Sequence, residues 1–215
     1  MKVVFALYEG MTALDLVGPY QVFAIAPGME ITLAASTSGP KQTDSGMVIH
    51  AEKAFSEVAG ADVIVVPGTG QPQAPLADKV LLDWLARASP KAQLTCSVCT
   101  GSLVLGAAGL LRGKRATSHW AALDLLREFG AEPVQERVVF EGSTVTAAGV
   151  SAGIDMALSV IARLVGEPAA RMVQLGIEYD PQPPFNAGSP AAAGPELVQA
   201  VKQWLAQSAP GVLQL

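Results

Sequence analysis

Short apolar runs alternate with amphipathic segments along this chain of 215 residues. The runs are rich in β-branched residues, whereas the segments between them repeat apolar positions about every 3.6 residues, as amphipathic helices do. The predicted strands are Val3 to Leu7, Ile31 to Ala35, Val63 to Val66 and Leu94 to Val98. The predicted helices are Leu14 to Ala26, Val80 to Ala88, Gly101 to Leu111, Ala121 to Phe129, Gly153 to Leu164, Ala169 to Ile177 and Glu196 to Gln207. This alternation is typical of an α/β fold with a mostly parallel sheet.

Two stretches depart from the alternation. Residues Gln135 to Ala147 place β-branched runs on both sides of Glu141-Gly142-Ser143, which predicts a small antiparallel hairpin. Between Asp180 and Pro195 five prolines and two glycines predict an ordered surface loop without regular structure. No composition shift or internal repeat marks a boundary, so we expect one domain over residues 1–215.

Composition narrows the classes of partner. Half of the residues are hydrophobic, 15% are charged, and the formal net charge is −5 with scattered basic residues, which disfavours nucleic acid and anionic membranes as partners. The apolar N-terminal run stops at Glu9, before the core of a signal peptide is complete, and no run reaches the roughly 18 residues of a membrane span. Cys96 and Cys99 are too close for a useful structural disulfide. We therefore expect a cytoplasmic protein.

The strongest chemical signal is the passage from strand to helix at Cys99. The segment LTCSVCTGSL (Leu94 to Leu103) changes directly from a strand pattern to a helix pattern, with Gly101 close behind the cysteine. This is the shape of a nucleophile elbow, which lifts a side chain out of the sheet at the carboxyl ends of the strands. The partial positive charge of the following helix favours a thiolate, so a lowered pKa and a reactive Cys99 are expected.

The two cysteines also allow other interpretations. Free cysteines are often inert core residues, but the elbow favours a nucleophile at Cys99. The Cys96-x-x-Cys99 spacing also occurs in dithiol redox proteins, yet Cys96 falls inside the strand and is expected to lie buried behind the elbow. With two histidines in the chain, a metal site is not predicted.

Thiolate chemistry needs a proton donor, and Asp15 follows the first strand between apolar neighbours. A half-buried carboxyl there would have a raised pKa, although an ordinary helix-start aspartate gives the same local pattern. The loop Pro67-Gly68-Thr69-Gly70 can offer backbone N–H groups to developing negative charge. His119 is either a partner of the cysteine or a histidine packed beside Trp120.

Together these segments resemble the ThiJ/PfpI superfamily, whose fold is similar to class I glutamine amidotransferases, and within it the isocyanide hydratase branch. The most specific stretches are LDLVGP (Leu14 to Pro19), SVCTGSLVLGAAGLL (Ser97 to Leu111) and PPFNAGSP (Pro183 to Pro190). The resemblance extends through Arg115 to Trp120 and Gly149 to Asp155, which in the family lie near the nucleophile's pocket.

The resemblance implies a flavodoxin-like three-layer sandwich and a homodimer that acts on a small molecule without a metal or organic cofactor. It further implies that Cys99 is the nucleophile, Asp15 the acid/base and Thr100 a positioning residue. The implied reaction is attack of the thiolate on the terminal isocyanide carbon, proton delivery by Asp15, and hydrolysis of the thioimidate to a formamide. The expected pocket residues are Gly68, Thr69, Gly70, His119, Val150 and Ser151.

Two residues depart from the family pattern. Thr69 stands where relatives commonly have a second glycine, and because threonine resists a positive φ, the backbone donors of that loop are expected to be displaced. Glu9 stands where close relatives often have proline, and its carboxylate is expected to raise the pKa of Asp15. The superfamily also includes hydrolases acting on amides or carbonyl adducts, and effector domains of transcription regulators. The alternatives to a hydratase are therefore another cysteine-dependent hydrolase or amidase, and a non-enzymatic sensor whose cysteine responds to oxidation or which binds a small molecule. A helix-turn-helix region is not predicted here, which disfavours direct DNA binding.

Overall fold

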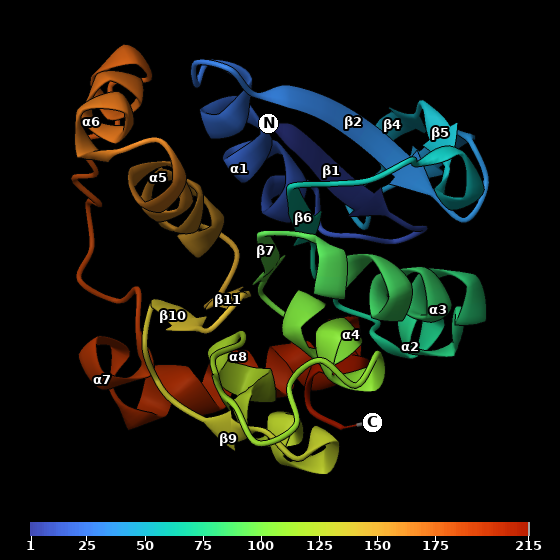
Figure 1. The fold of residues 1–215 in the computed structure, drawn as a ribbon. Coiled ribbons are helices and arrows are strands. Elements are labelled where there is room, and N and C mark those ends of the chain that lie inside the picture. The colour runs from blue at the N-terminus through green and yellow to red at the C-terminus, as the bar shows by residue number, and fades with distance from the viewer. Residues whose placement is uncertain (215) are drawn as a thin grey trace.

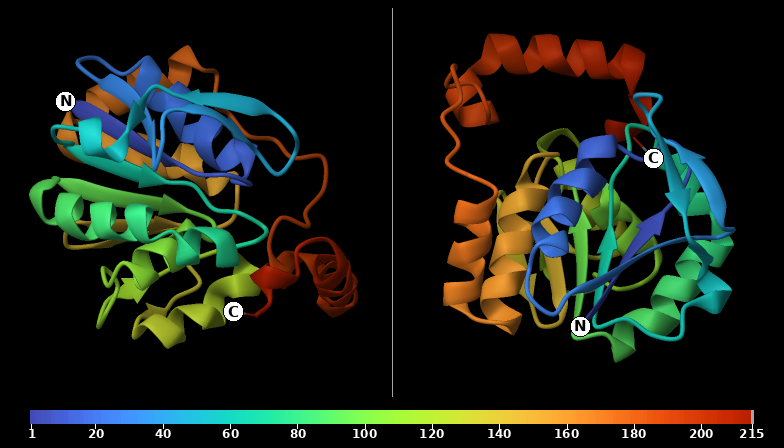
Figure 2. Two further views of the ribbon diagram at one scale, coloured as in Figure 1. Left: turned by 90° about the vertical axis from the view of Figure 1, so that its right-hand side faces the viewer. Right: turned by 90° about the horizontal axis from the view of Figure 1, so that it is seen from above.

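The computed structural model describes residues 1–214, which form a seven-stranded sheet between two layers of helices (Figures 1 and 2). From edge to edge the strands are β10 (Val138–Glu141), β11 (Thr144–Ala147), β7 (Leu94–Val98), β6 (Val63–Val66), β1 (Lys2–Leu7), β2 (Glu30–Ala35) and β5 (Lys53–Ala54). Every neighbouring pair is parallel except β10 with β11. The α/β fold with a mostly parallel sheet, which the alternating pattern predicts, is thus confirmed, as is the flavodoxin-like sandwich that the resemblance implies.

The central strands are buried on both faces. Every residue of β6 and β7 is buried, as is every residue of β1 except Lys2 at its start. A strand covered by helices on both sides needs continuous apolar character rather than alternation. The four strands predicted from such runs are all present, within one residue of the expected bounds.

Helices cover both faces of the central sheet. One face carries α1 (Ala13–Ala24), α5 (Ala152–Leu164) and α6 (Glu167–Gly176), and the other carries α2 (Gln73–Ala77), α3 (Lys79–Ala88), α4 (Gly101–Ala107) and the 3-10 helix η3 (Trp120–Phe129) (Figure 1). Helices α1 and α5 approach closely at glycines: a Cβ on Gly153 would lie 3.0 Å from Cδ of Pro19, and one on Gly18 would lie 3.2 Å from Ile154. This contact fixes the start of α1, where Asp15 lies.

Two predicted helices differ from those observed. Helix α4 ends at Ala107 rather than Leu111, because Gly109 adopts a left-handed φ of 79° and the N–H of Leu110 turns back to the carbonyl of Leu105. The predicted helix Ala121 to Phe129 is a 3-10 helix. Apolar spacing does not separate a 3-10 helix from an α-helix over so short a segment.

The predicted hairpin has the expected turn but a larger role. Strands β10 and β11 pair around Gly142, whose φ is 62°, and β11 continues the parallel sheet beside β7. The hairpin is therefore an edge of the central sheet. The small separate antiparallel sheet is formed instead by β3 (Gly39–Gln42) and β4 (Val48–Ala51), and two further short strands are β8 (Arg115–Ala116) and β9 (Glu132–Pro133).

The two C-terminal helices, α7 (Pro190–Ala193) and α8 (Pro195–Ser208), form an arm that lies against the rest of the molecule (Figure 2). The proline-rich stretch is irregular only as far as Ser189, because the short helix α7 follows, and α8 begins after Gly194. The Ser189 hydroxyl accepts a hydrogen bond from the N–H of Ala192, and proline is tolerated in the first turn of a helix. The prediction of a loop through Pro195 was wrong in this respect. The remaining elements are the 3-10 helices η1 (Phe55–Glu57), η2 (Ser89–Lys91) and η4 (Pro210–Val212).

Helix length and apolar character also bear on membrane insertion. In the part of the chain that the structure describes, no helix combines the length and the apolar character needed to span a bilayer.

Candidate active site

The segments that follow the neighbouring strands β1, β6, β7 and β11 meet at one end of the sheet. They carry Asp15 in the first turn of α1, Gly68 with Thr69, Cys99 with Thr100, and Val150. Ligands of open parallel sheets bind beyond the carboxyl ends of the strands, so this edge is where a site is expected.

Cys99 occupies a strained turn between β7 and α4. Its φ of 57° lies in the left-handed region, which non-glycine residues rarely adopt. Its N–H donates to the carbonyls of Ala147 and Ala148, 3.2 and 2.9 Å away, and its carbonyl accepts from the hydroxyls of Ser102 and Ser118, both at 3.1 Å. The strand-to-helix turn predicted at Cys99 is therefore present and is held from both sides.

Gly101 allows the turn to close. A Cβ at this position would collide with the carbonyl oxygen of Val66 and lie 2.8 Å from that of Pro67. The backbone of α4 thus starts directly against the end of β6, and only glycine fits between them.

Asp15 is fully buried beside the cysteine. Its Oδ2 accepts a hydrogen bond from the N–H of Gly68 at 2.8 Å, while its Oδ1 accepts no N–H or O–H from residues 1–214. Burial raises the pKa of Asp15 to about 7; the Gly68 N–H and the Cys99 thiol oppose this rise, and Asp44 adds to it. A carboxyl group that holds its proton up to neutral pH is therefore placed next to the nucleophile.

The pKa of Cys99 moves in the direction opposite to that expected. Burial raises the pKa of the thiol, and the Asp15 carboxylate raises it further, whereas hydrogen bonds from the N–H groups of Thr100 and Val150 lower it. The helix N-terminus alone does not outweigh the loss of water around the sulfur. Asp15 and Cys99 therefore titrate as a coupled pair in which the carboxyl ionises first.

The loop after β6 has its N–H groups engaged by side chains. The N–H of Gly68 binds Asp15, and the N–H of Thr69 binds the hydroxyl of Thr100 at 2.7 Å. The donors that face Cys99 are instead the N–H groups of Thr100 and Val150. The N–H groups of Gly68 and Thr69 therefore position the acid and the threonine, and these two donors are not free to bind an oxyanion.

The two departures from the family pattern have consequences other than those expected. Thr69 keeps a negative φ, and its hydroxyl donates to the carbonyl of Gly10 at 2.7 Å and accepts from the N–H of Gln71 at 3.1 Å, so it fastens the loop. Glu9 is exposed and accepts the N–H of Gln42 at 2.9 Å. The neighbouring carboxylate that raises the pKa of Asp15 is Asp44, not Glu9.

Three predicted pocket residues, His119, Gly70 and Ser151, are not among the residues that form hydrogen bonds with the sulfur of Cys99. Nδ1 of His119 accepts the N–H of Ala121 at the start of η3, and burial lowers the histidine's pKa. A Cβ on Gly70 would lie 3.0 Å from that of Ala209. The hydroxyl of Ser151 accepts from Arg137 at 3.4 Å.

Two residues near the site were not singled out from the sequence. The hydroxyl of Tyr8, at the end of β1, donates to the carbonyl of Pro67, and its pKa is raised by burial and by the charges of Asp15 and Cys99. Ser118 holds the carbonyl of Cys99. The position of Tyr8 at a strand end and that of Ser118 beside His119 were the signals in the sequence that could have found them.

Among residues 1–214, no group of three or more acidic, histidine or cysteine side chains is arranged to hold a metal ion.

A cavity of about 650 Å³ is lined by residues that bind Cys99, although neither Cys99 nor Asp15 belongs to the lining itself. Its wall includes Val150 and Ser118, which bind Cys99, while Cys99 itself is 6% exposed. The volume lies in the range of small-molecule sites. The residues that line it are Leu14, Thr117, Ser118, His119, Trp120, Leu123, Gln135, Glu136, Arg137, Ala148, Gly149, Val150, Ser151, Gly188, Ser189, Pro190 and Ala191.

Known proteins resemble this chain both in sequence and in fold. A model of the DJ-1/PfpI family matches residues 1–163. The chain is 42% identical to the isonitrile hydratase of Pseudomonas putida over 97% of this chain and 91% of that protein. It is 28% identical to the HTH-type transcriptional regulator CdhR of Pseudomonas aeruginosa over 79% of this chain and 52% of the regulator. The crystal structure of a THiJ/PfpI family protein from Pseudomonas syringae matches with a TM-score of 0.94 and 38% identity, covering 99% of this chain and 88% of that one.

Proposed function

The chain belongs to the DJ-1/PfpI family, and on that premise we propose that it is an isonitrile hydratase, which adds water to an organic isocyanide and releases the N-substituted formamide. The observation that carries the proposal is the pair formed by Asp15 and Cys99, a buried carboxyl with a pKa of about 7 in contact with a nucleophile. Similarity over nearly the whole chain to an isonitrile hydratase that is 42% identical supports the choice of reaction.

The first half-reaction needs a proton acceptor and then a proton donor. The ionised Asp15 takes the proton of the Cys99 thiol as the sulfur attacks the terminal isocyanide carbon and forms a C–S bond. The lone pair left on that carbon then takes the same proton from Asp15, which gives a neutral thioimidate. A group with a pKa near the working pH suits both transfers.

The second half-reaction reuses the same residues. Asp15, ionised again, accepts a proton from water as the water oxygen attacks the thioimidate carbon, and passes that proton to the nitrogen. As the resulting adduct expels the sulfur of Cys99, Asp15 takes the proton of the adduct's new hydroxyl group and returns it to the sulfur, and the formamide leaves. The N–H groups of Thr100 and Val150 stabilise the negative charge on the sulfur in both steps.

Access to the sulfur favours a slender substrate. Cys99 is 6% exposed and Asp15 is fully buried, so a reacting group must reach them through a narrow opening. An isocyanide is linear and ends in its reactive carbon, whereas carbonyl adducts and amides carry substituents on both sides of the reacting atom. The cavity beside Val150 leaves room for the substituent on nitrogen.

A homodimer is also part of the proposal. Helix α6 exposes Met172 and Leu175, which are 58% and 81% accessible, on the outer side of the α5 and α6 pair. Apolar residues at this density on one helix face suit a self-complementary contact. Light scattering of the purified chain should give twice the mass of the 22.2 kDa protomer, and a protomer mass would contradict the dimer.

The decisive experiment measures formamide production from a small aryl isocyanide. We expect turnover by the wild type, none by Cys99→Ala, and a large loss in Asp15→Asn. Cys96→Ala is the matched control: Cys96 is buried within β7, so its loss perturbs the same strand without removing the nucleophile, and activity should be kept. A folded wild type that turns over no isocyanide, or a Cys99→Ala variant that remains active, would contradict the proposal.

A further inference from the structure

The cavity beside Cys99 is much larger than the reacting group requires. An isocyanide group consists of two atoms in line, whereas the cavity holds about 650 Å³. If the reactive carbon lies against Cys99, near Val150 and Ser118, the rest of the cavity is occupied by the substituent on nitrogen. The walls of the cavity therefore decide which substituents are accepted.

The walls offer apolar surface and no free charge. Leu14, Leu123 and Val150 contribute apolar side chains to the lining. The two charged residues in the wall are already paired, Glu136 with Arg115 and Arg137 with Asp155. A charged substituent would break such a pair or go without a partner, so the cavity fits an uncharged, apolar one.

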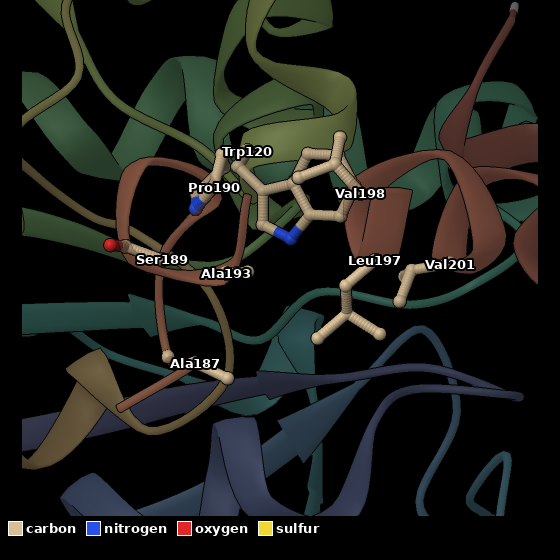
Figure 3. Close-up of a pocket in the computed structure, with 9 residues that line it drawn as sticks. Trp120, Ala187, Ser189, Pro190, Ala193, Leu197, Val198 and Val201 are labelled. Atoms are coloured by element: carbon tan, nitrogen blue, oxygen red, sulfur yellow. The ribbon is translucent and has the colours of Figure 1, made fainter. Parts of the chain in front are cut away.

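A second hollow lies behind one wall. It holds about 90 Å³ between the start of η3 and the arm formed by α7 and α8. Figure 3 shows the indole of Trp120 in the centre of this hollow's lining, with Ser189 and Pro190 to one side in the view and Leu197 and Val198 to the other. The hollow is lined on the arm side by apolar residues, including Val198 and Val201.

Trp120 lines both spaces. So does the segment Gly188 to Pro190, which lies against it. The indole and this segment are thus the partition between the cavity beside the cysteine and the smaller hollow. A smaller side chain at position 120 would join the two spaces and lengthen the site toward α8.

We propose that Trp120 is a specificity-determining residue, which limits the length of the uncharged, apolar substituent that the substrate carries. The inference rests on the proposed isonitrile hydratase activity, because it assigns the substituent of that reaction's substrate. It goes beyond that activity in naming the residue that sets the size limit and the space that becomes available without it.

The test compares short and long isocyanides. The ratio of kcat/KM for n-hexyl isocyanide to that for n-propyl isocyanide is measured for the wild type, Trp120→Phe and Trp120→Leu. We expect the ratio to rise by about tenfold or more in Trp120→Leu, in line with the effect of one or two methylene groups in an apolar pocket, and by less in Trp120→Phe. Trp204→Leu is the matched control, since Trp204 is exposed on α8 and lines neither space.

A compensating variant separates the partition from a general loosening of the site. In Trp120→Leu combined with Val198→Phe, the new ring fills the smaller hollow, so the ratio should return toward the wild-type value. Trp120→Phe keeps an aromatic ring and should give the smaller rise even where the leucine variant folds poorly. An unchanged ratio in both single variants, or no reversal by Val198→Phe, would overturn the proposal.

Binding of products gives a readout that does not depend on turnover. In the Cys99→Ala background, the affinities for N-hexylformamide and N-propylformamide should shift with Trp120→Leu in the same direction as the kinetic ratio. A wild type that turns over no isocyanide, combined with this shift in formamide binding, would overturn the hydratase proposal and leave the size limit standing. Turnover of isocyanides by the wild type, without any shift in formamide binding, would support the hydratase proposal and overturn the size limit.

Discussion

The hydroxyl of Thr100 and the backbone of Thr69 form a reciprocal pair: the hydroxyl accepts the N–H of Thr69 and donates to its carbonyl, each at 2.7 Å. The pair joins the turn that carries Cys99 to the loop whose Gly68 N–H holds Asp15. A single threonine side chain thus sets the distance between the nucleophile's turn and the loop that binds the acid.

Thr100→Val should be destabilised and less active, because valine has the shape of threonine but leaves both backbone groups of Thr69 unpaired in a buried place. A loss of about 2 to 4 kcal/mol in the free energy of unfolding is expected from two such groups, measured by urea denaturation. Thr100→Ser keeps the hydroxyl and should lose about 1 kcal/mol or less. Equal stability of the valine and serine variants would show that the pair is not important.

Gly101→Ala should disrupt the cysteine turn. The added methyl group would overlap the carbonyl oxygens of Val66 and Pro67, which belong to the end of β6 and cannot move independently. We expect a loss of about 3 kcal/mol or more in the free energy of unfolding, together with loss of turnover. Gly60→Ala is the control, since a Cβ there meets nothing within 4 Å, and it should change stability by about 0.5 kcal/mol at most. A fully stable, active Gly101→Ala variant would contradict this account of the turn.

Much of the fold could be predicted from the sequence because its signals are local. The buried strands are continuous apolar runs, and the turn at Cys99 is encoded by a change of period followed by Gly101. The end of α4 was misplaced because apolar spacing continues to Leu111 after the backbone has left the helix at Gly109. The hairpin's membership of the central sheet depends on pairing between β11 and β7, which are far apart in sequence.

The proximity of Asp15 and Cys99 could be predicted from the sequence, whereas the electrostatics of the pair could not. The segments that follow adjacent strands bring Asp15 and Cys99 together, which the order of the strands implies. The direction of the Cys99 pKa depends instead on how much water the fold removes, and burial at 6% exposure outweighs the helix N-terminus. Likewise, proximity in sequence suggested Glu9 as the neighbour of Asp15, whereas Asp44 acts on it from a loop that follows β3.

The rate of the proposed reaction should rise with pH through about 7. Before attack, Asp15 must be ionised to accept the thiol proton, and its pKa is about 7, so kcat/KM increases as that proton leaves. Asp44→Asn removes a negative charge that raises the pKa of Asp15, and the rise should therefore move to lower pH. The pH profiles of kcat/KM for the wild type and Asp44→Asn test this.

Asp124→Asn provides the control for that profile, because Asp124 is an exposed residue of η3 paired with Arg127 and should leave the profile unchanged. An Asp44→Asn profile displaced to higher pH, or a wild type whose rate is flat between pH 6 and 8, would contradict the assignment of Asp15 as the acceptor.

Asp15 should also make folding less favourable as the pH rises. The unfolded chain ionises this carboxyl near 3.8, whereas the folded chain keeps its proton until about 7, so unfolding releases a proton throughout that interval. Stability due to this group is therefore full below pH 3.8 and is lost progressively up to pH 7, by roughly 4 kcal/mol in total. Asp15→Asn lacks this dependence, and its stability relative to the wild type should grow as the pH rises.

Urea denaturation of both proteins between pH 4.5 and 8.5 measures that difference. The difference in free energy of unfolding should increase up to about pH 7 and then level off, because above its folded-state pKa Asp15 is ionised in both states. Ionisation of Cys99 lies above this interval, since burial and Asp15 raise its pKa, and so it does not mask the effect. A difference that stays constant or shrinks between pH 4.5 and 7 would show that the folded protein does not hold a proton on Asp15, and the proton transfers proposed for catalysis would then need another donor.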